Sequence, residues 1–441
     1  MPPKKFHIDV FGCQMNAREA QWLAAILRRR GFVEAPSDEA DILLVNTCSV
    51  REKPQRRIEA WLKGLALRPD RMVGVLGCVA QQLGERLFEY REDVRLVAGG
   101  ASVAAVPDAI EALMRSPNSR VSLLDFPGEH EEAEFDDAPL AQASVSIMRG
   151  CDNFCAYCIV PFTRGRQKSR SLDAVLAECA ARVRAGALEI TLLGQNVNAW
   201  GKDRAVSPGF AALLERVASL PGLERLRFVS PHPADMDDAT ASLFAKCPSL
   251  CPRLHLPLQS GSDRVLARMR RRYGAADFLR LADKLRRARP DMAFSADLIV
   301  GFPGETEEDF RDTLRLVREV GFVSSYSFAY SDRPGTRASL MPDKISPEIK
   351  SERLARLQEA QEDLGRAWLE SRVGERTTLL IEGKSPRQGL EKTSWQGRDP
   401  YGAPGHVALA GDPSGQLVEV EIVAARKHSL LCRPVGKSGS L

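Results

Sequence analysis

The chain has 441 residues, of which 44% are hydrophobic and 27% are charged, and its formal net charge is +4 at pH 7. This length exceeds that of one ordinary domain and predicts two or three. No run of about eighteen apolar residues occurs and no apolar signal region opens the chain, so we expect no membrane partner and a cytoplasmic location. The ten cysteines are too few for a disulfide scaffold. The small positive charge does not by itself indicate a nucleic-acid partner.

Strands and helices alternate through residues 1–140, the first predicted domain. Strands are predicted for residues 5–10, 41–46 and 72–76, and helices for 17–30, 53–67 and 79–90. This alternation predicts an N-terminal parallel α/β domain. Residues 123–139 are acidic and poor in apolar side chains, so we interpret them as a linker.

A cysteine follows each of these three predicted strands. The residues are Cys13, Cys48 and Cys78. The carboxyl ends of parallel strands lie at one edge of a sheet, where ligands bind, so we expect the three thiols to meet there. A single buried cysteine is more simply a small hydrophobic residue. Three at equivalent places favour a three-thiolate iron-sulfur site with one open iron.

A denser thiol group opens the second predicted domain, residues 143–370. Cys151, Cys155 and Cys158 lie within eight residues, directly after a strand-like run at 143–148. Zinc usually needs further cysteine or histidine ligands, and over the next sixty residues only Cys179 could supply one. A 4Fe-4S cluster held by three thiolates keeps one iron open to a small molecule. The spacing therefore predicts a second iron-sulfur site.

The rest of this domain reads as a partial (β/α)6 barrel. Strands are predicted at 189–193, 225–229, 253–256, 294–300 and 323–330, and helices at 171–185, 210–220, 264–272, 277–288, 307–320 and 346–371. Loops at the carboxyl ends of barrel strands face a common cavity. The loop residues expected to contact the small molecule are Gln195, Ser230, Gln259, Ser260, Gly301, Pro303 and Gly304. Each loop taken alone is also explained as a strand-to-helix turn.

Basic residues come directly after the second thiol group. They are Arg164, Arg166, Lys168 and Arg170. Charge runs are most often solvated helix faces. Arginine is also the preferred partner of phosphate, and this run lies one short loop from the thiols, so we expect contacts to a polyanionic substrate.

The third predicted domain spans residues 372–441. Alternating β patterns at 377–382 and 415–424 flank a Gly/Pro-rich middle at 396–413, which predicts a small antiparallel β-barrel. Trp395, Arg426 and Lys427 are expected to stack on RNA and to neutralise it. A domain that only covers the larger barrel is the alternative.

Over nearly its whole length the chain resembles the methylthiotransferases, a family of radical S-adenosylmethionine (SAM) enzymes. The resemblance is carried by residues 12–16, 46–53, 150–166, 193–198 and 228–233. It implies an N-terminal methylthiotransferase domain, a radical SAM barrel and a C-terminal TRAM RNA-binding barrel. Residues 393–406 depart from the usual TRAM pattern.

The resemblance also implies cofactors and a reaction. It implies two 4Fe-4S clusters, one on Cys13, Cys48 and Cys78 and one on Cys151, Cys155 and Cys158. One SAM would supply a methyl group, and a second would supply a radical that abstracts hydrogen from C2 of N6-dimethylallyladenosine at position 37 of tRNA, where the methylthio group is then added. The implied partners are tRNA and a low-potential electron donor such as flavodoxin or ferredoxin, and we expect a monomer.

Other readings remain open on the sequence. A methylthiotransferase could act on threonylcarbamoyl adenosine or on an aspartate of a ribosomal protein. A non-catalytic iron-sulfur protein that binds RNA would use the same thiols without cleaving SAM. No side chain in the sequence stands out as an essential acid or base.

Overall fold

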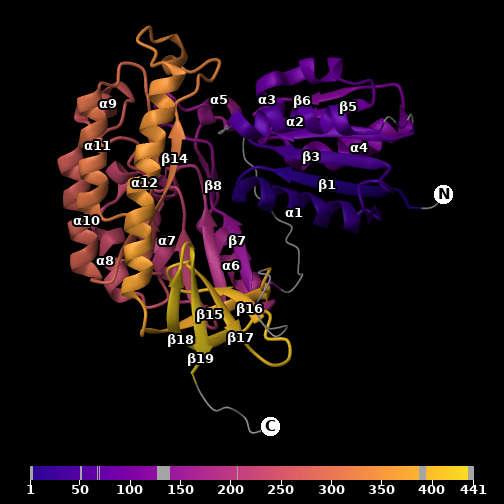
Figure 1. Cartoon of the computed structure of the whole chain (residues 1–441). Coiled ribbons are helices and arrows are strands. Elements are labelled where there is room, and N and C mark those ends of the chain that lie inside the picture. The colour runs from indigo at the N-terminus through magenta and orange to yellow at the C-terminus, as the bar shows by residue number, and fades with distance from the viewer. Residues whose placement is uncertain are drawn as a thin grey trace.

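The computed structural model describes residues 3–49, 52–66, 68, 70–126, 140–205, 207–386 and 394–435. Three parts follow one another along the chain, an N-terminal α/β sheet, a large open barrel beside it and a small β-barrel below (Figure 1). Most of the predicted acidic linker, residues 127–139, lies outside the described residues. Leu123, where that linker was expected to begin, instead ends strand β6.

The N-terminal part is a parallel sheet of six strands in the order β2-β1-β3-β4-β5-β6. Its elements are β1 Lys5–Phe11, α1 Gln14–Arg29, β2 Val33–Glu34, β3 Ile42–Thr47, α2 Glu52–Gly64, β4 Met72–Gly77, α3 Cys78–Leu83, β5 Val94–Ala98, α4 Val106–Arg115 and β6 Val121–Leu123. Every residue of β3 and β4 is buried, as a parallel sheet covered by helices on both faces requires. The predicted parallel α/β class is confirmed. The structure also contains β2, β5, α4 and β6, which were not predicted.

The central part is an open barrel made of two half-sheets, β11-β10-β7 and β12-β13-β14. Its strands are β7 Gln142–Ser146, β8 Met148–Arg149, β9 Lys168–Ser169, β10 Glu189–Leu193, β11 Arg225–Phe228, β12 Arg253–His255, β13 Ala293–Val300 and β14 Ser324–Ala329. Its helices are α5 Val160–Arg164, α6 Leu172–Arg184, α7 Gly209–Ala218, α8 Asp238–Lys246, α9 Asp263–Arg268, α10 Ala275–Ala288, α11 Glu307–Val320 and α12 Pro347–Ser371. Strands β7 and β14 are the two ends of the row and do not pair among the described residues, so the barrel is partial, as predicted.

The C-terminal part is a closed barrel in the order β15-β16-β17-β19-β18. Its strands are β15 Arg376–Lys384, β16 Ser394–Arg398, β17 Pro404–Ala408, β18 Leu417–Arg426 and β19 Ser429–Pro434. The Gly/Pro-rich middle expected to be a connection contains β16 and β17. The glycines are needed there, because a Cβ on Gly397 would lie 2.5 Å from the Leu380 carbonyl oxygen and one on Gly405 would lie 2.6 Å from a methyl of Leu379. Four of the five pairings are antiparallel, and β17 pairs with β19 in parallel.

Arginines at the amino ends of the barrel strands hold the small barrel against the large one. Arg225 donates to the carbonyl oxygens of Arg398 and Thr378, both at 2.8 Å. Arg253 donates to the carbonyl oxygen of Tyr401 at 2.8 Å. The two barrels are thus joined mainly by side chain to backbone bonds. No helix in the described part of the chain is long and apolar enough to cross a membrane.

Candidate functional site

The N-terminal thiols follow three strands that are neighbours in the sheet. Cys13 is the N-cap of α1, Cys48 follows β3, and Cys78 begins α3. Residue 12 must be glycine, because a Cβ there would lie 2.9 Å from the Cβ of Cys48. A hydrogen bond with Cys48 and the charge of Arg164 together lower the pKa of Cys13 to about 6 against the opposing effect of burial. Cys13 and Cys48 therefore lie together at one edge of the sheet, where the strand ends were predicted to place them.

Arg164 reaches this edge from the other domain. It ends α5, and its guanidinium group donates twice to the Glu19 carboxylate of α1, once at 3.3 Å. Burial would lower the pKa of Arg164, but the charges of Cys78 and Glu19 and the hydrogen bond to Glu19 raise it well above its usual value. The N-terminal thiols are therefore next to a buried ion pair that spans two domains.

The second thiol group lies on a loop between β8 and α5. Gly150, just before Cys151, has φ of +71°, and a Cβ there would lie 2.1 Å from the Arg166 carbonyl oxygen. Only glycine fits both the backbone conformation and the space. The loop is fixed from the far side of the barrel, because the Ala156 amide donates to the Met269 carbonyl oxygen at 2.9 Å. Burial first, and the charge of Cys155 next, raise the pKa of Cys158 to about 12.

A partly buried arginine also lies beside this second group. The guanidinium of Arg271 donates to the sulfur of Cys155 at 3.4 Å, to the Tyr273 hydroxyl at 2.9 Å and to the Pro257 carbonyl oxygen at 3.1 Å. In the sequence, Arg271 lies in the basic run at 268–272. The run was a correct signal for charge, but packing alone shows which of its members turns inward.

The donor set fits iron-sulfur clusters better than a single ion. In the described part of the chain no three Cys, His, Asp or Glu side chains are arranged to hold one metal ion. In a 4Fe-4S cluster each thiolate binds its own iron, so the sulfurs need not converge on one point. The donors here are soft thiolates, which favour iron-sulfur clusters over the cations that prefer oxygen ligands.

Several polar atoms at the barrel rim are buried and have no hydrogen-bond partner among the residues that the structure describes. They are Oε1 of Gln195, Oδ1 of Asn196 and Nε2 of His232. Ser230 and Gln259 lie at the same rim with left-handed backbones, at φ of 59° and 72°. Buried polar atoms are nearly always satisfied and strained backbones gather at functional sites. A polar ligand bound at this rim would account for both features.

The other rim residues expected to bind ligand are held by protein contacts. Ser260 lies 3.3 Å from the Thr313 hydroxyl, and Gly301 donates to the Glu305 carboxylate at 2.7 Å. The Pro303 carbonyl oxygen accepts from Arg268 at 3.2 Å, and a Cβ on Gly304 would lie 2.8 Å from Arg268. The Ser260 contact fixes the loop after β12 against α11, and the Arg268 contacts fix the loop between β13 and α11 against α9. Ligand contacts by these four residues stay a prediction.

The basic run after the thiols divides into two buried and two exposed residues. Arg164 and Arg170 are each 5% exposed and are paired with Glu19 and Glu178. Arg166 and Lys168 are exposed, and Arg166 pairs with Asp152 at 2.8 Å. Phosphate can reach the exposed residues directly. Contact with Arg164 or Arg170 would require their carboxylate partners to be displaced.

The C-terminal residues expected to bind RNA divide in the same way. Trp395 is 5% exposed and packs in the barrel core, where its ring nitrogen donates to the Leu409 carbonyl oxygen at 3.2 Å. Arg426 and Lys427 are exposed at the end of β18. The alternating sequence pattern predicted that Trp395 lies in a β-barrel. It did not predict whether the side chain faces the barrel core or the surface.

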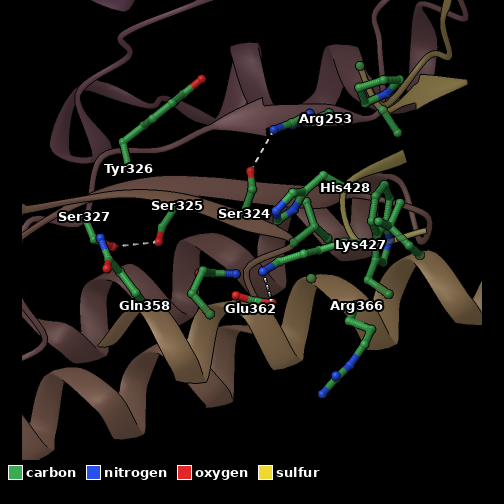
Figure 2. A pocket seen from close by; sticks show the side chains of 18 of the residues that line it. Arg253, Ser324, Ser325, Tyr326, Ser327, Gln358, Glu362, Arg366, Lys427 and His428 are labelled. Carbon is green, nitrogen blue, oxygen red and sulfur yellow. Dashed lines mark hydrogen bonds and ion pairs between the residues drawn. The ribbon is translucent and has the colours of Figure 1, made fainter. Parts of the chain in front are cut away.

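A cleft of about 400 Å³ lies where β14, α12 and the small barrel meet (Figure 2). Lys427 and His428 reach over it from the small barrel, and Lys427 pairs with Glu362 of α12 at 2.8 Å. Arg253 crosses its far side to the Ser324 hydroxyl at 2.8 Å. The lining of the cleft includes the basic residues Arg253, Arg366, Arg398 and Lys427 among other polar and apolar side chains.

Comparisons with known proteins agree with this geometry. Residues 145–317 match the family model described as the Radical SAM superfamily, and residues 5–99 match the model described as Uncharacterized protein family UPF0004. The radical SAM methyltransferase TsrM of Kitasatospora setae, solved with cobalamin and a 4Fe-4S cluster, aligns with a TM-score of 0.55 over 76% of this chain and 77% of its own, at 15% identity. That likeness supports the fold alone.

Closer relatives extend over the full length. The tRNA-2-methylthio-N(6)-dimethylallyladenosine synthase of Nitratidesulfovibrio vulgaris (strain DP4) is 51% identical, covering 99% of each chain. The synthase of the same name from Lawsonia intracellularis is 47% identical, covering 99% of this chain and 100% of its own. The chain belongs to the family of radical SAM tRNA-2-methylthio-N(6)-dimethylallyladenosine synthases.

Proposed function

We propose that this chain adds a methylthio group to C2 of N6-dimethylallyladenosine at position 37 of tRNA. The observation that carries the proposal is the pair of three-cysteine groups in neighbouring domains, in a chain 51% identical over 99% of its length to a synthase named for this reaction. A radical SAM enzyme needs one three-cysteine group for its radical chemistry. A second group is explained by a reaction that also delivers sulfur.

Some residues of the chain hold the cofactors, and others orient the substrate. Cys13, Cys48 and Cys78 hold one cluster and Cys151, Cys155 and Cys158 hold the other. When bound, the second cluster supplies the electron that cleaves SAM to a 5'-deoxyadenosyl radical.

The SAM site uses the rim of the large barrel. The buried Oε1 of Gln195 accepts from the amino or hydroxyl groups of SAM, since it has no hydrogen-bond partner in the described part of the chain. Ser230 and Gln259, whose backbones have positive φ, lie beside it at the same rim. Ser260, Gly301, Pro303 and Gly304 complete the rim.

The tRNA lies along the open side of the large barrel. Arg166 and Lys168, beside the second thiol group, and Arg426 and Lys427, above the cleft, supply exposed positive charge for its phosphates. A low-potential donor such as flavodoxin or ferredoxin delivers electrons, and the enzyme works as a cytoplasmic monomer.

Mass analysis of tRNA nucleosides from cells lacking the gene tests the proposal. The expected result is loss of the 2-methylthio form of N6-dimethylallyladenosine with the unmethylthiolated nucleoside in its place, restored by the wild-type gene and not by Cys151→Ala or Cys13→Ala. Changes confined to threonylcarbamoyl adenosine or to a ribosomal protein would assign the chain to another substrate. If the anaerobic, reduced protein released no 5'-deoxyadenosine from SAM, the non-catalytic reading would stand instead.

A further inference from the structure

One five-residue helix links the two thiol groups. The loop that carries Cys151, Cys155 and Cys158 runs directly into α5, and α5 packs against α3, the helix that begins at Cys78. Arg164 is the last residue of α5. The segment that supplies the thiols of one site therefore also contributes the guanidinium group that lies beside the other site.

The guanidinium group of Arg164 is enclosed by the N-terminal domain. Its side chain is 5% exposed, and its carboxylate partner, Glu19, is 9% exposed. A Cβ on Gly100 would lie 3.4 Å from the guanidinium carbon, so the backbone of that glycine forms one wall. The charges of Cys78 and Cys13 both act on Arg164. A buried cation is costly unless it is paired, and here Glu19 is the carboxylate partner of Arg164.

Charge balance shows why the thiol site needs this cation. Three thiolates gathered at a sheet edge repel one another, and positive charge or hydrogen bonds to sulfur stabilise them.

We propose that Arg164 is a positioning residue for the N-terminal cluster, supplied by the radical SAM domain, which stabilises the Cys13, Cys48 and Cys78 thiolates and sets the reduction potential of the cluster that they hold. This inference rests on the proposed function, because it assumes a cluster at those thiols. It replaces the expectation that Arg164 contacts RNA.

The chain offers a matched control. Arg18 forms another buried arginine-carboxylate pair between these two domains, with Glu178 at 2.7 Å and exposures of 2% and 0%. Loss of either pair loosens the same interface. The charges of Cys78 and Cys13 act on Arg164, whereas Arg18 is directed to a carboxylate of α6.

The test uses full-length protein in which Cys151, Cys155 and Cys158 are all changed to Ala, so that only the N-terminal cluster remains. Iron content after anaerobic reconstitution and the midpoint potential by EPR-monitored redox titration are measured for Arg164→Gln, Arg164→Lys, Glu19→Gln and Arg18→Gln. The parent should hold about four irons. If it holds none, the proposed cluster site fails, whatever Arg164 does.

We expect Arg164→Gln to lose half or more of the iron and to shift the potential of the remaining cluster to more negative values, because a nearby positive charge favours the more negatively charged reduced state. Arg164→Lys should retain most of the iron. Glu19→Gln should keep the iron and shift the potential the opposite way. Arg18→Gln should match the parent in both. Unchanged iron and potential in Arg164→Gln, or equal losses in Arg18→Gln, would overturn the inference.

Discussion

Arg18 in α1 donates to Glu178 in α6 at 2.7 Å, across 160 residues of sequence. The Glu178 carboxylate is fully buried, also accepts from Arg170 at 2.6 Å, and lies 3.9 Å from Arg182. One carboxylate therefore joins the N-terminal sheet to the large barrel and organises three guanidinium groups around itself.

Removing this shared carboxylate should destabilise the protein strongly. We expect Glu178→Ala to lower the free energy of unfolding by about 3–5 kcal/mol, because buried cations lose their counter-ion. Urea denaturation followed by circular dichroism measures the change. Asp363→Ala, which removes an exposed partner of Arg366 on α12, is the control and should have little effect. Equal effects of the two substitutions would contradict the importance given to Glu178.

The docking of the small barrel should depend on Arg225. This residue is 4% exposed, and its guanidinium serves two carbonyl oxygens and the Thr378 hydroxyl. Arg225→Met should cost about 2–3 kcal/mol, since it leaves buried acceptors unsatisfied. Calorimetry should then show the small barrel melting separately. Arg433→Met removes an exposed pair with Glu421 and should leave the transition single. A single transition in both variants would disprove this docking role.

Gly150 should be essential to the second thiol group. Gly150→Ala places a Cβ 2.1 Å from the Arg166 carbonyl oxygen and forces the loop before Cys151 to move. Iron should fall from about eight to about four per chain, because only the cluster at these thiols is lost. Gly186→Ala is the matched control, since its φ is +104° but nothing lies within 4 Å of the added Cβ. Full iron in Gly150→Ala would refute the steric argument.

His232 should make stability depend on pH. Burial first, and the charge of Arg271 next, lower the pKa of His232 to about 3. Between pH 6.5 and 3 the unfolded chain binds a proton at this residue and the folded chain does not, so stability falls as the pH falls, by up to about 1.4 kcal/mol per pH unit. In His232→Asn this contribution should vanish.

Urea denaturation at pH 6.5 and 5.5 measures this effect, as the difference in unfolding free energy between the two pH values in each protein. His428→Asn, which removes an exposed histidine of the small barrel, serves as the control. If His232→Asn loses as much stability over this interval as the wild type, His232 is not the source of the pH dependence.

The exposed basic residues beside the second thiol group should contribute to tRNA affinity. The double variant Arg166→Ala, Lys168→Ala should weaken binding and flatten the plot of log affinity against log salt by roughly 0.7–0.9 for each phosphate that the protein no longer neutralises. Filter binding of tRNA at several salt concentrations measures both. Arg280→Ala removes a charge that is 71% exposed on α10 and should change neither quantity. An unaltered salt slope in the double variant would place the RNA elsewhere.

Periodicity and strand-end position predicted most of the architecture. The alternation in the first domain indicated the three strands that carry Cys13, Cys48 and Cys78, and β10 was predicted at its observed bounds. Short strands such as β2 and β6, with two and three residues, carry too little pattern to be found. Strands β16 and β17 were missed because their glycines normally indicate turns, whereas here they permit close contact inside a small barrel.

The direction of individual side chains could not be predicted in the same way. Arg164, Arg166, Lys168 and Arg170 look alike in the sequence, but the first is buried beside Glu19 of α1 and the last beside Glu178 of α6. Trp395 looks like a stacking residue and is part of a core. Burial of these residues depends on how helices and strands pack against one another, which the local sequence pattern does not contain.

The pairing of β17 with β19 determines when the small barrel is able to form. Strand β19 pairs with β17 on one side and with β18 on the other, so it closes the ring. During synthesis the four earlier strands cannot close into a barrel until residue 434 has emerged from the ribosome. Two of their edges stay without hydrogen-bond partners until then. A nascent chain that stops before residue 434 would leave both strand edges open to pairing with neighbouring polypeptides. Premature termination near the 3' end of the message would therefore promote aggregation more strongly than the loss of a few residues would by itself.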